Sequence, residues 1–184
     1  MKQRITRKTN WLLLLMMLMW TSTVKGDELV DGIYYKLNQI SDSRSTATVT
    51  RGPLNSSTRT YRKYSGNIKI PSKITVSGRD YVVTIIATSA FSDCDGLTSV
   101  LLPNTINTIM QDAFARCTQI KSLTLPDSLT IYDRGFIGCS NLKSITFLGS
   151  EIELRDKIFY GCDSIESITF NGTTVNSCLV SKRA

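Results

Sequence analysis

Cysteine is the residue type in this sequence whose chemistry and spacing most suggest a site. The 184-residue chain contains five cysteines and no histidine. A nucleophilic thiol needs a neighbouring base or cation that lowers its pKa, and the usual base is absent. Zinc sites use close pairs such as C-x-x-C, whereas four of these cysteines lie 22 or 23 residues apart. We therefore expect no catalytic residue, no metal site and no cofactor. The four are Cys94, Cys117, Cys139 and Cys162.

We interpret these four cysteines as buried free thiols, with disulfides as the alternative. Equivalent atoms in adjacent turns of a repeat lie roughly 4.8 Å apart, which a disulfide can bridge, and exported proteins often contain disulfides. Equivalent side chains point the same way, however, so bridging needs rotations for which the apolar neighbours leave little room. A free cysteine packs as a small apolar residue. Cys178 lies outside the spacing and is the one cysteine that we expect to be reactive or able to pair.

Two pairs of carboxylates were considered as acid and base candidates. Glu151 and Glu153 alternate along an extended stretch, and Asp93 and Asp95 flank Cys94. Because no second group converges on either pair in the sequence, we expect all four to be solvated surface charges.

The cysteines belong to a longer repeat whose period of 22 or 23 residues is typical of a solenoid. Four segments align without a gap, and several columns of the alignment each hold one residue type, such as phenylalanine, cysteine or an apolar residue. Side chains in a column are predicted to pack against their counterparts one repeat away. The segments are 90–103, 113–126, 135–148 and 158–171, and the phenylalanine column is Phe91, Phe114, Phe136 and Phe159.

Each repeat is predicted to hold one short strand and one short helical segment. In residues 122–125, SLTL, polar and apolar residues alternate, which places Leu123 and Leu125 inward. Pro126 lacks a backbone donor and turns the chain away from the sheet. Residues 109–117 are predicted to form one or two helical turns. Four such strands are expected to stack in parallel, one per repeat.

The N-terminal residues have the pattern of an export signal. The first 26 contain five basic residues and no acid, and a ten-residue apolar stretch covers 11–20. This stretch is shorter than the roughly 20 residues that a membrane span needs. We predict a signal peptide at 1–26 and an exported mature chain without a transmembrane segment; an uncleaved anchor or a buried helix is the alternative. The net charge of +7 falls to +2 beyond residue 26 (17 basic against 15 acidic), so we expect no nucleic-acid partner.

Residues 27–65 are predicted to form an N-terminal cap of β-strands with a polar loop. Strands are expected within 32–38 and 46–50, and 51–64 is rich in turn-forming and basic residues. Its basic residues, with Tyr61 and Tyr64, could contact nucleic acid or an acidic glycan. We prefer a solvated loop, because a charge run is usually soluble surface.

The repeats resemble the BspA-type leucine-rich repeat of bacterial surface proteins. That family's pattern, L-x-x-I-x-[IL]-P-x-x-[VL]-x-x-I-x-x-x-A-F-x-x-C, is matched nearly position for position by residues 97–117. The resemblance covers 66–172 and implies a β-rich solenoid: a right-handed leucine-rich repeat coil with parallel strands, short helical turns and an N-terminal β cap. The C-terminal tail, 173–184, is expected to fold back over the exposed edge of the last strand. The family is associated with secreted or surface-attached proteins that bind other proteins, some of them as adhesins.

The outward positions of the predicted strands form the candidate partner-binding surface, since repeat proteins usually bind through such a sheet. The alternative is that small polar residues merely keep an open sheet soluble. Four strands present only ~250 Å², against about 800 Å² per partner in a stable interface, so this face predicts weak or multivalent binding. The candidates are Ser99, Leu101, Lys121, Ser122, Thr124, Lys143, Ser144, Thr146, Ser167 and Thr169.

Two functional hypotheses follow from these observations. The first is a non-enzymatic exported protein that binds a protein partner on a host or bacterial surface. The alternative is a glycan-binding or structural module of the cell envelope that makes contact through the loop at 51–64.

Overall fold

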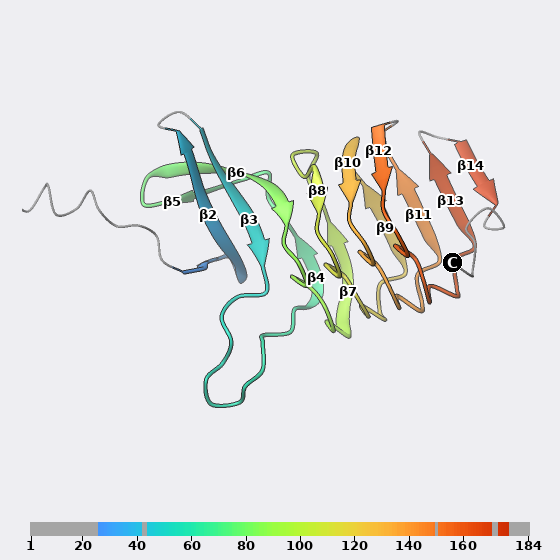
Figure 1. The fold of residues 1–184 in the computed structure, drawn as a ribbon, viewed down its shortest axis with the longest axis horizontal. Coiled ribbons are helices and arrows are strands. Elements are labelled where there is room, and N and C mark those ends of the chain that lie inside the picture. The colour runs from blue at the N-terminus through green and yellow to red at the C-terminus, as the bar shows by residue number, and fades with distance from the viewer. Residues whose placement is uncertain (1–25, 42–43, 150, 171–172, 177–184) are drawn as a thin grey trace, which may run out of the picture.

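The computed structural model describes residues 26–41, 44–149, 151–170 and 173–176, the last four as a strand only. The predicted signal peptide, apart from Gly26, and Cys178 lie outside these residues. Every regular element described is a strand (Figure 1). The strands are β1 (Glu28–Val30), β2 (Ile33–Ser41), β3 (Arg44–Thr50), β4 (Ser65–Lys69), β5 (Lys73–Val76), β6 (Arg79–Ile86), β7 (Gly96–Leu101), β8 (Thr108–Ile109), β9 (Ser122–Leu125), β10 (Ser128–Ile131), β11 (Ser144–Phe147), β12 (Glu151–Leu154), β13 (Ser167–Phe170) and β14 (Thr173–Asn176).

The regular repeats each contribute two strands, one to each of two rows that run along the molecule (Figure 1). The larger sheet has the order β1-β2-β3-β6-β8-β10-β12. The strands β3, β6, β8, β10 and β12 pair in parallel, and β5 pairs antiparallel with β6. The smaller sheet contains β9, β11 and β13 in parallel. The expectation of one strand per repeat is therefore wrong. The second strand forms because segments such as SLTI at 128–131 also alternate, with Leu129 and Ile131 buried.

The predicted helical turns are wrong, because the amides that a helix would use internally bond to the next repeat. Within 109–117, Ile109 ends strand β8 and residues 111–116 form consecutive turns. Within them the Phe114 amide donates to the Gly135 carbonyl at 2.8 Å. Asp112 and Arg116 adopt left-handed backbone conformations, with φ of 55° and 57°. An α-helix needs right-handed dihedrals throughout and i to i−4 bonds, so this backbone joins neighbouring repeats instead.

The smaller sheet differs from the predicted four-strand stack at both ends. β7 pairs in parallel with β4, and within the described residues these two strands form a sheet of their own, separate from β9. At the other end β14 pairs antiparallel with β13. The chain therefore folds back over the last parallel strand, as expected for its tail, and the edge of β13 is covered.

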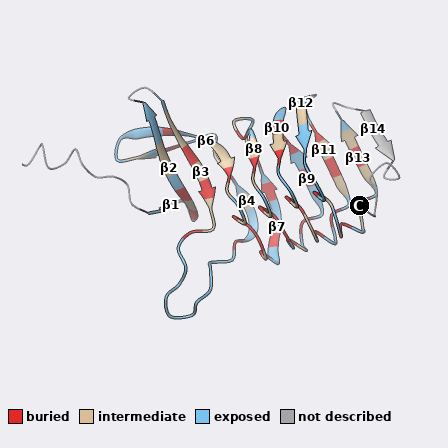
Figure 2. Cartoon of the chain, viewed as in Figure 1, coloured by how far each residue is buried: buried red, intermediate tan, exposed pale blue. Residues whose placement is uncertain are grey.

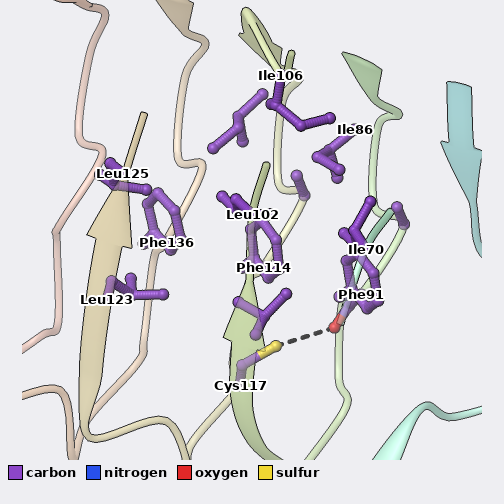
Figure 3. Packing of buried hydrophobic residues seen from close by; sticks show 14 of the residues in the cluster. Ile70, Ile86, Phe91, Leu102, Ile106, Phe114, Cys117, Leu123, Leu125 and Phe136 are labelled. Atoms are coloured by element: carbon purple, nitrogen blue, oxygen red, sulfur yellow. Dashed lines mark hydrogen bonds between the residues drawn. The ribbon is translucent and has the colours of Figure 1, made fainter. Parts of the chain in front are cut away.

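Aromatic side chains stack through the centre of the repeats, as the alignment predicts. Phe91 and Phe114 are stacked with ring centroids 4.9 Å apart, and Phe114 and Phe136 with centroids 5.1 Å apart (Figure 3). Phe159 continues the column at 5.7 Å from Phe136. Tyr64 covers the other end, 4.9 Å from Phe91 and tilted by 51°. Buried residues occur along the strands of both rows (Figure 2) and belong to one hydrophobic cluster that includes the column.

Gly149 lies directly against the backbone of the preceding repeat. The Leu148 amide donates to the Leu125 carbonyl at 3.0 Å, and a Cβ on Gly149 would overlap the backbone of Asp127. Gly149→Ala is therefore expected to lower the free energy of unfolding by about 1–3 kcal/mol, since the backbone must shift to admit a methyl group. Urea denaturation measures this loss.

Gly96→Ala is the matched control for Gly149→Ala. A Cβ at Gly96 would meet the side-chain carbon of Ser65 at 3.1 Å, with the backbone of that residue farther away. A shift of a few tenths of an ångström relieves this contact, so we expect a smaller loss. Equal losses in the two variants would contradict the close approach at Gly149.

Candidate functional site

The four repeat cysteines are free and buried, as predicted. Each of the last three thiols donates a hydrogen bond to the backbone carbonyl of the phenylalanine in the preceding repeat. Cys117 Sγ lies 3.0 Å from the Phe91 oxygen, the contact drawn in Figure 3. The equivalent distances are 3.1 Å for Cys139 to Phe114 and 3.0 Å for Cys162 to Phe136. The cysteine column thus joins consecutive repeats through S–H donors as well as by packing.

Burial keeps the thiols of Cys94 and Cys117 protonated. It raises the pKa of Cys117 to about 12, and it also raises the pKa of Cys94, whose sulfur accepts a bond from the Tyr64 amide at 3.3 Å. A reactive cysteine needs the opposite shift. No group of three or more histidine, cysteine, aspartate or glutamate side chains in the described ranges could hold a metal ion.

The four candidate carboxylates lie at the surface, but three of them, Asp93, Asp95 and Glu153, are ion-paired, which the sequence did not indicate. Arg116 donates two bonds to Asp93, at 2.6 and 2.8 Å. These bonds lower the pKa of Asp93 to about 2. Arg134 makes the same two-bond contact with Asp112, both at 2.8 Å. Asp95 and Glu153 pair with Lys63 and Arg155. Because both two-bond pairs join adjacent repeats, these acids support the fold.

Six of the ten candidate binding residues are brought together on the smaller sheet. Ser144 pairs in register with Ser122 on one side and Ser167 on the other. Thr146 is flanked in the same way by Thr124 and Thr169. The residues between them, Leu123, Ile145 and Ile168, are buried, so the serines and threonines form two parallel columns on the outer face.

The other four candidates are placed differently. Ser99 and Leu101 lie on β7, outside the smaller sheet. Ser99 donates to Asn67 Oδ1 at 2.8 Å, and the Leu101 side chain is exposed. Lys121 is exposed beside β9, whereas Lys143 is paired with Glu166 at 2.9 Å. The predicted face is therefore interrupted after β7.

A second outward face was missed by the sequence analysis. Strands β8, β10 and β12 of the larger sheet carry a shallow hollow of about 550 Å³. The alternating segments SLTI and EIEL could have revealed it, because each has the same two-residue period as SLTL. Its polar lining comes from Asn107, Thr108, Ser128, Thr130, Glu151 and Glu153.

The loop at 51–64 is anchored at both ends. The Tyr64 hydroxyl donates to the Thr50 carbonyl at 2.8 Å and accepts from the Tyr34 amide at 3.0 Å. Burial raises the pKa of Tyr64 to about 12. The suggestion that Tyr64 could contact a ligand is wrong, because its ring packs on Phe91; Tyr61 is the exposed tyrosine of this loop.

These features define a class: a strand-rich leucine-rich repeat protein whose parallel strands stack on two sides of an apolar core. The chain belongs to the BspA type leucine rich repeat region family, whose model matches residues 61–179 in six copies. The described part of the chain contains no helix long and apolar enough to span a membrane.

Several solved structures are similar to this chain. A leucine-rich repeat protein from Bacteroides capillosus is 25% identical, with a TM-score of 0.62 over 79% of this chain and 99% of its own. A leucine rich cell surface protein from Faecalibacterium prausnitzii is 19% identical, with a TM-score of 0.47 over 80% of this chain and 40% of its own. The pneumococcal vaccine antigen PcpA is 21% identical, with a TM-score of 0.45 over 80% of this chain and 38% of its own. No curated protein sequence matches the chain.

Proposed function

We propose that this protein is a non-enzymatic, exported leucine-rich repeat protein that binds a protein partner at the cell surface through the outer face of β9, β11 and β13. The observation that carries the proposal is the pair of polar columns on this face, Ser122-Ser144-Ser167 and Thr124-Thr146-Thr169, held in register by parallel pairing. Their flat, hydrogen-bonding surface is suited to a protein partner, because leucine-rich repeat proteins use extended sheet faces for recognition.

Further parts of the proposal rest on the sequence pattern. The N-terminal 26 residues supply the export signal, 27–65 the β cap, 66–172 the repeats and 173–184 the tail. The repeats wind as a right-handed solenoid. Export would bring the outer sheet face into contact with other cells or with host proteins.

The size of the face sets the strength of binding that we expect. Three strands of four residues present roughly 200 Å², at 4.8 Å between strands and 3.3 Å per residue. A stable interface takes about 800 Å² per partner. We therefore expect weak single-site binding that becomes firm when many copies are displayed together.

The test uses threonines on both outward faces. The mature chain, displayed on beads, is incubated with host and bacterial surface proteins, and retained proteins are then titrated singly. Thr124→Lys with Thr146→Lys places two long charged side chains on the smaller sheet and is expected to weaken binding tenfold or more. Thr108→Lys with Thr130→Lys makes the same change on the larger sheet and is expected to leave binding unchanged.

Two outcomes would overturn the proposal. Equal loss in both threonine pairs would show that the smaller sheet is not the contact surface. A loss that follows only substitutions in the loop, Arg59→Gln or Arg62→Gln, would favour the alternative of a glycan-binding or structural envelope module.

A further inference from the structure

We propose that a hollow at the base of the loop 51–64 binds a carboxylate-bearing sugar. This inference deepens the alternative glycan hypothesis and is independent of the smaller sheet, because β9, β11 and β13 contribute no residue to the hollow. The loop projects from the body of the molecule between β3 and β4 (Figure 1). The hollow measures about 240 Å³, and its lining includes Tyr34, Leu54, Asn55, Thr60, Tyr61 and Arg62.

Tyr34, which lines the hollow, is closely approached by Gly52. Gly52 is buried and left-handed, with φ of 77°. A Cβ at this position would overlap the Tyr34 ring, so glycine allows the loop to start directly against the ring. The Tyr64 hydroxyl binds the Tyr34 amide at the other end of the loop. Both ends of the loop are therefore held against Tyr34.

The tip of the loop is closed by its own hydrogen bonds. Asn55 Oδ1 accepts from the amides of Ser57 and Thr58, each at 3.0 Å. The Asn55 amide donates to the Thr60 carbonyl at 2.9 Å. The Asn55 oxygen is thus used internally, whereas its NH₂ group can donate to a ligand.

Tyr61 is held in place by an arginine. The Arg51 guanidinium lies 4.4 Å from the centroid of the Tyr61 ring, within range of a cation–π contact. Arg51 Nη2 in turn donates to the Ser92 carbonyl at 3.0 Å, which ties the guanidinium to the first regular repeat. The Tyr61 side chain remains 42% exposed. The hollow thus offers a fixed and accessible aromatic surface.

The charge around the hollow selects an anion. The loop contains four basic residues and no acid. Lys63 is neutralised by Asp95 at 3.1 Å, and Arg51 is engaged with Tyr61. Arg59 and Arg62 make no ion pair with the described part of the chain, and Arg62 lines the hollow. A guanidinium binds a carboxylate in a two-bond geometry.

The size and lining favour a single acidic sugar over a longer ligand. Pockets for drug-sized ligands measure about 300–1,000 Å³. At about 240 Å³, this hollow suits one sugar ring of an oligosaccharide. The apolar face of a pyranose packs on tyrosine, and its hydroxyls need donors such as the Asn55 NH₂ group. The Arg62 guanidinium then meets the carboxylate.

The experiment is a titration of the mature chain with matched sugars, followed by amide chemical shifts in the loop. The acidic probes are 3′-sialyllactose and a hyaluronan tetrasaccharide; the neutral probes are lactose and fully N-acetylated chitotetraose. We expect each acidic probe to bind at least tenfold more tightly than its neutral match, with the largest shifts at Asn55, Tyr61 and Arg62.

Arg59 provides the matched control. Arg62→Gln is expected to weaken binding of the acidic probes tenfold or more, whereas Arg59→Gln removes the same charge from the same loop outside the hollow and is expected to weaken it less than threefold. Tyr61→Ala should weaken binding as Arg62→Gln does, and Tyr61→Phe should preserve it. Thermal unfolding of each variant checks that the fold is intact.

Any of three results would overturn the proposal. The first is no binding by either acidic probe, or equal binding by acidic and neutral probes. The second is equal weakening by Arg59→Gln and Arg62→Gln, which indicates general attraction to charge. The third is tighter binding of an oligoglutamate peptide than of both acidic sugars. The variant carrying Thr124→Lys and Thr146→Lys should bind the acidic probes normally, so failure here leaves the proposal for the smaller sheet intact.

Discussion

Replacing Phe114 by alanine is expected to lower the free energy of unfolding by about 3–5 kcal/mol. The ring is completely buried and stacks between two others, with centroids 4.9 Å from Phe91 and 5.1 Å from Phe136. Its removal opens a cavity between two repeats and breaks both stacking contacts. Domains of this size have total stabilities of about 5–15 kcal/mol, so the loss is large. Urea denaturation followed by circular dichroism measures it.

Phe159→Ala is the control for the aromatic column. This ring is only partly buried and is stacked on one neighbour, Phe136, at 5.7 Å. The same truncation at the end of the column should therefore cost less than at Phe114. If both variants lost the same free energy, stacking between repeats would not be the main stabilising feature of the column.

The aromatic and cysteine columns were predictable because they depend on spacing alone. A constant period with one residue type per column leaves each Phe with its counterpart as the natural neighbour, and the stacked rings confirm this. The role of Cys117 as a donor to the Phe91 carbonyl was not predictable, since it depends on the path of the backbone between repeats. The repeat pattern predicts that Cys117 is buried, but it does not indicate the hydrogen-bond partner of its thiol.

The helical turns were predicted wrongly because local length and polarity resemble those of a short helix. The competing interaction is non-local: alternate amides in the turn, such as those of Phe114 and Arg116, donate to carbonyls in the next repeat. Residues with a left-handed backbone make these bonds between repeats possible. In the turns of the repeats they are a serine, aspartates, arginines and a lysine as well as glycines. Such residues give no glycine signal in the sequence, so the turn geometry could not be identified from it.

The candidate binding surface was predictable only in part, because the sequence shows the repeat but not the contacts between distant residues. The columns on β9, β11 and β13 follow from the repeat, and the structure aligns them. The separation of β7 did not follow, because its partner β4 comes from SGNIK at 65–69, a segment without an alternating apolar pattern. The hollow in the loop required contacts between Tyr34 and residues about 20 to 30 positions away, which no local pattern encodes.

The buried thiols and tyrosines have a joint consequence for alkaline stability. In the folded chain burial raises the pKa of Cys117 from 9.0 to about 12 and that of Tyr64 from 10.0 to about 12, and it raises the pKa of Cys94 as well. In the unfolded chain these groups lose their protons at ordinary values. The unfolded state therefore binds fewer protons above pH 9, and stability must fall as pH rises.

Between pH 9 and 10.5 we expect the Cys117 thiol to reduce the free energy of unfolding by about 2 kcal/mol, since one pKa unit corresponds to about 1.4 kcal/mol. The contribution is fully present below pH 9 and is lost as the pH rises toward 12 for Cys117. Urea denaturation under reducing conditions at pH 8, 9, 10 and 10.5 measures the slope. Cys117→Ala lowers stability at every pH but removes one titrating group, so its slope should be shallower by about 1.4 kcal/mol per pH unit. A slope unchanged by Cys117→Ala would mean that this thiol ionises as readily in the folded chain as in the unfolded one.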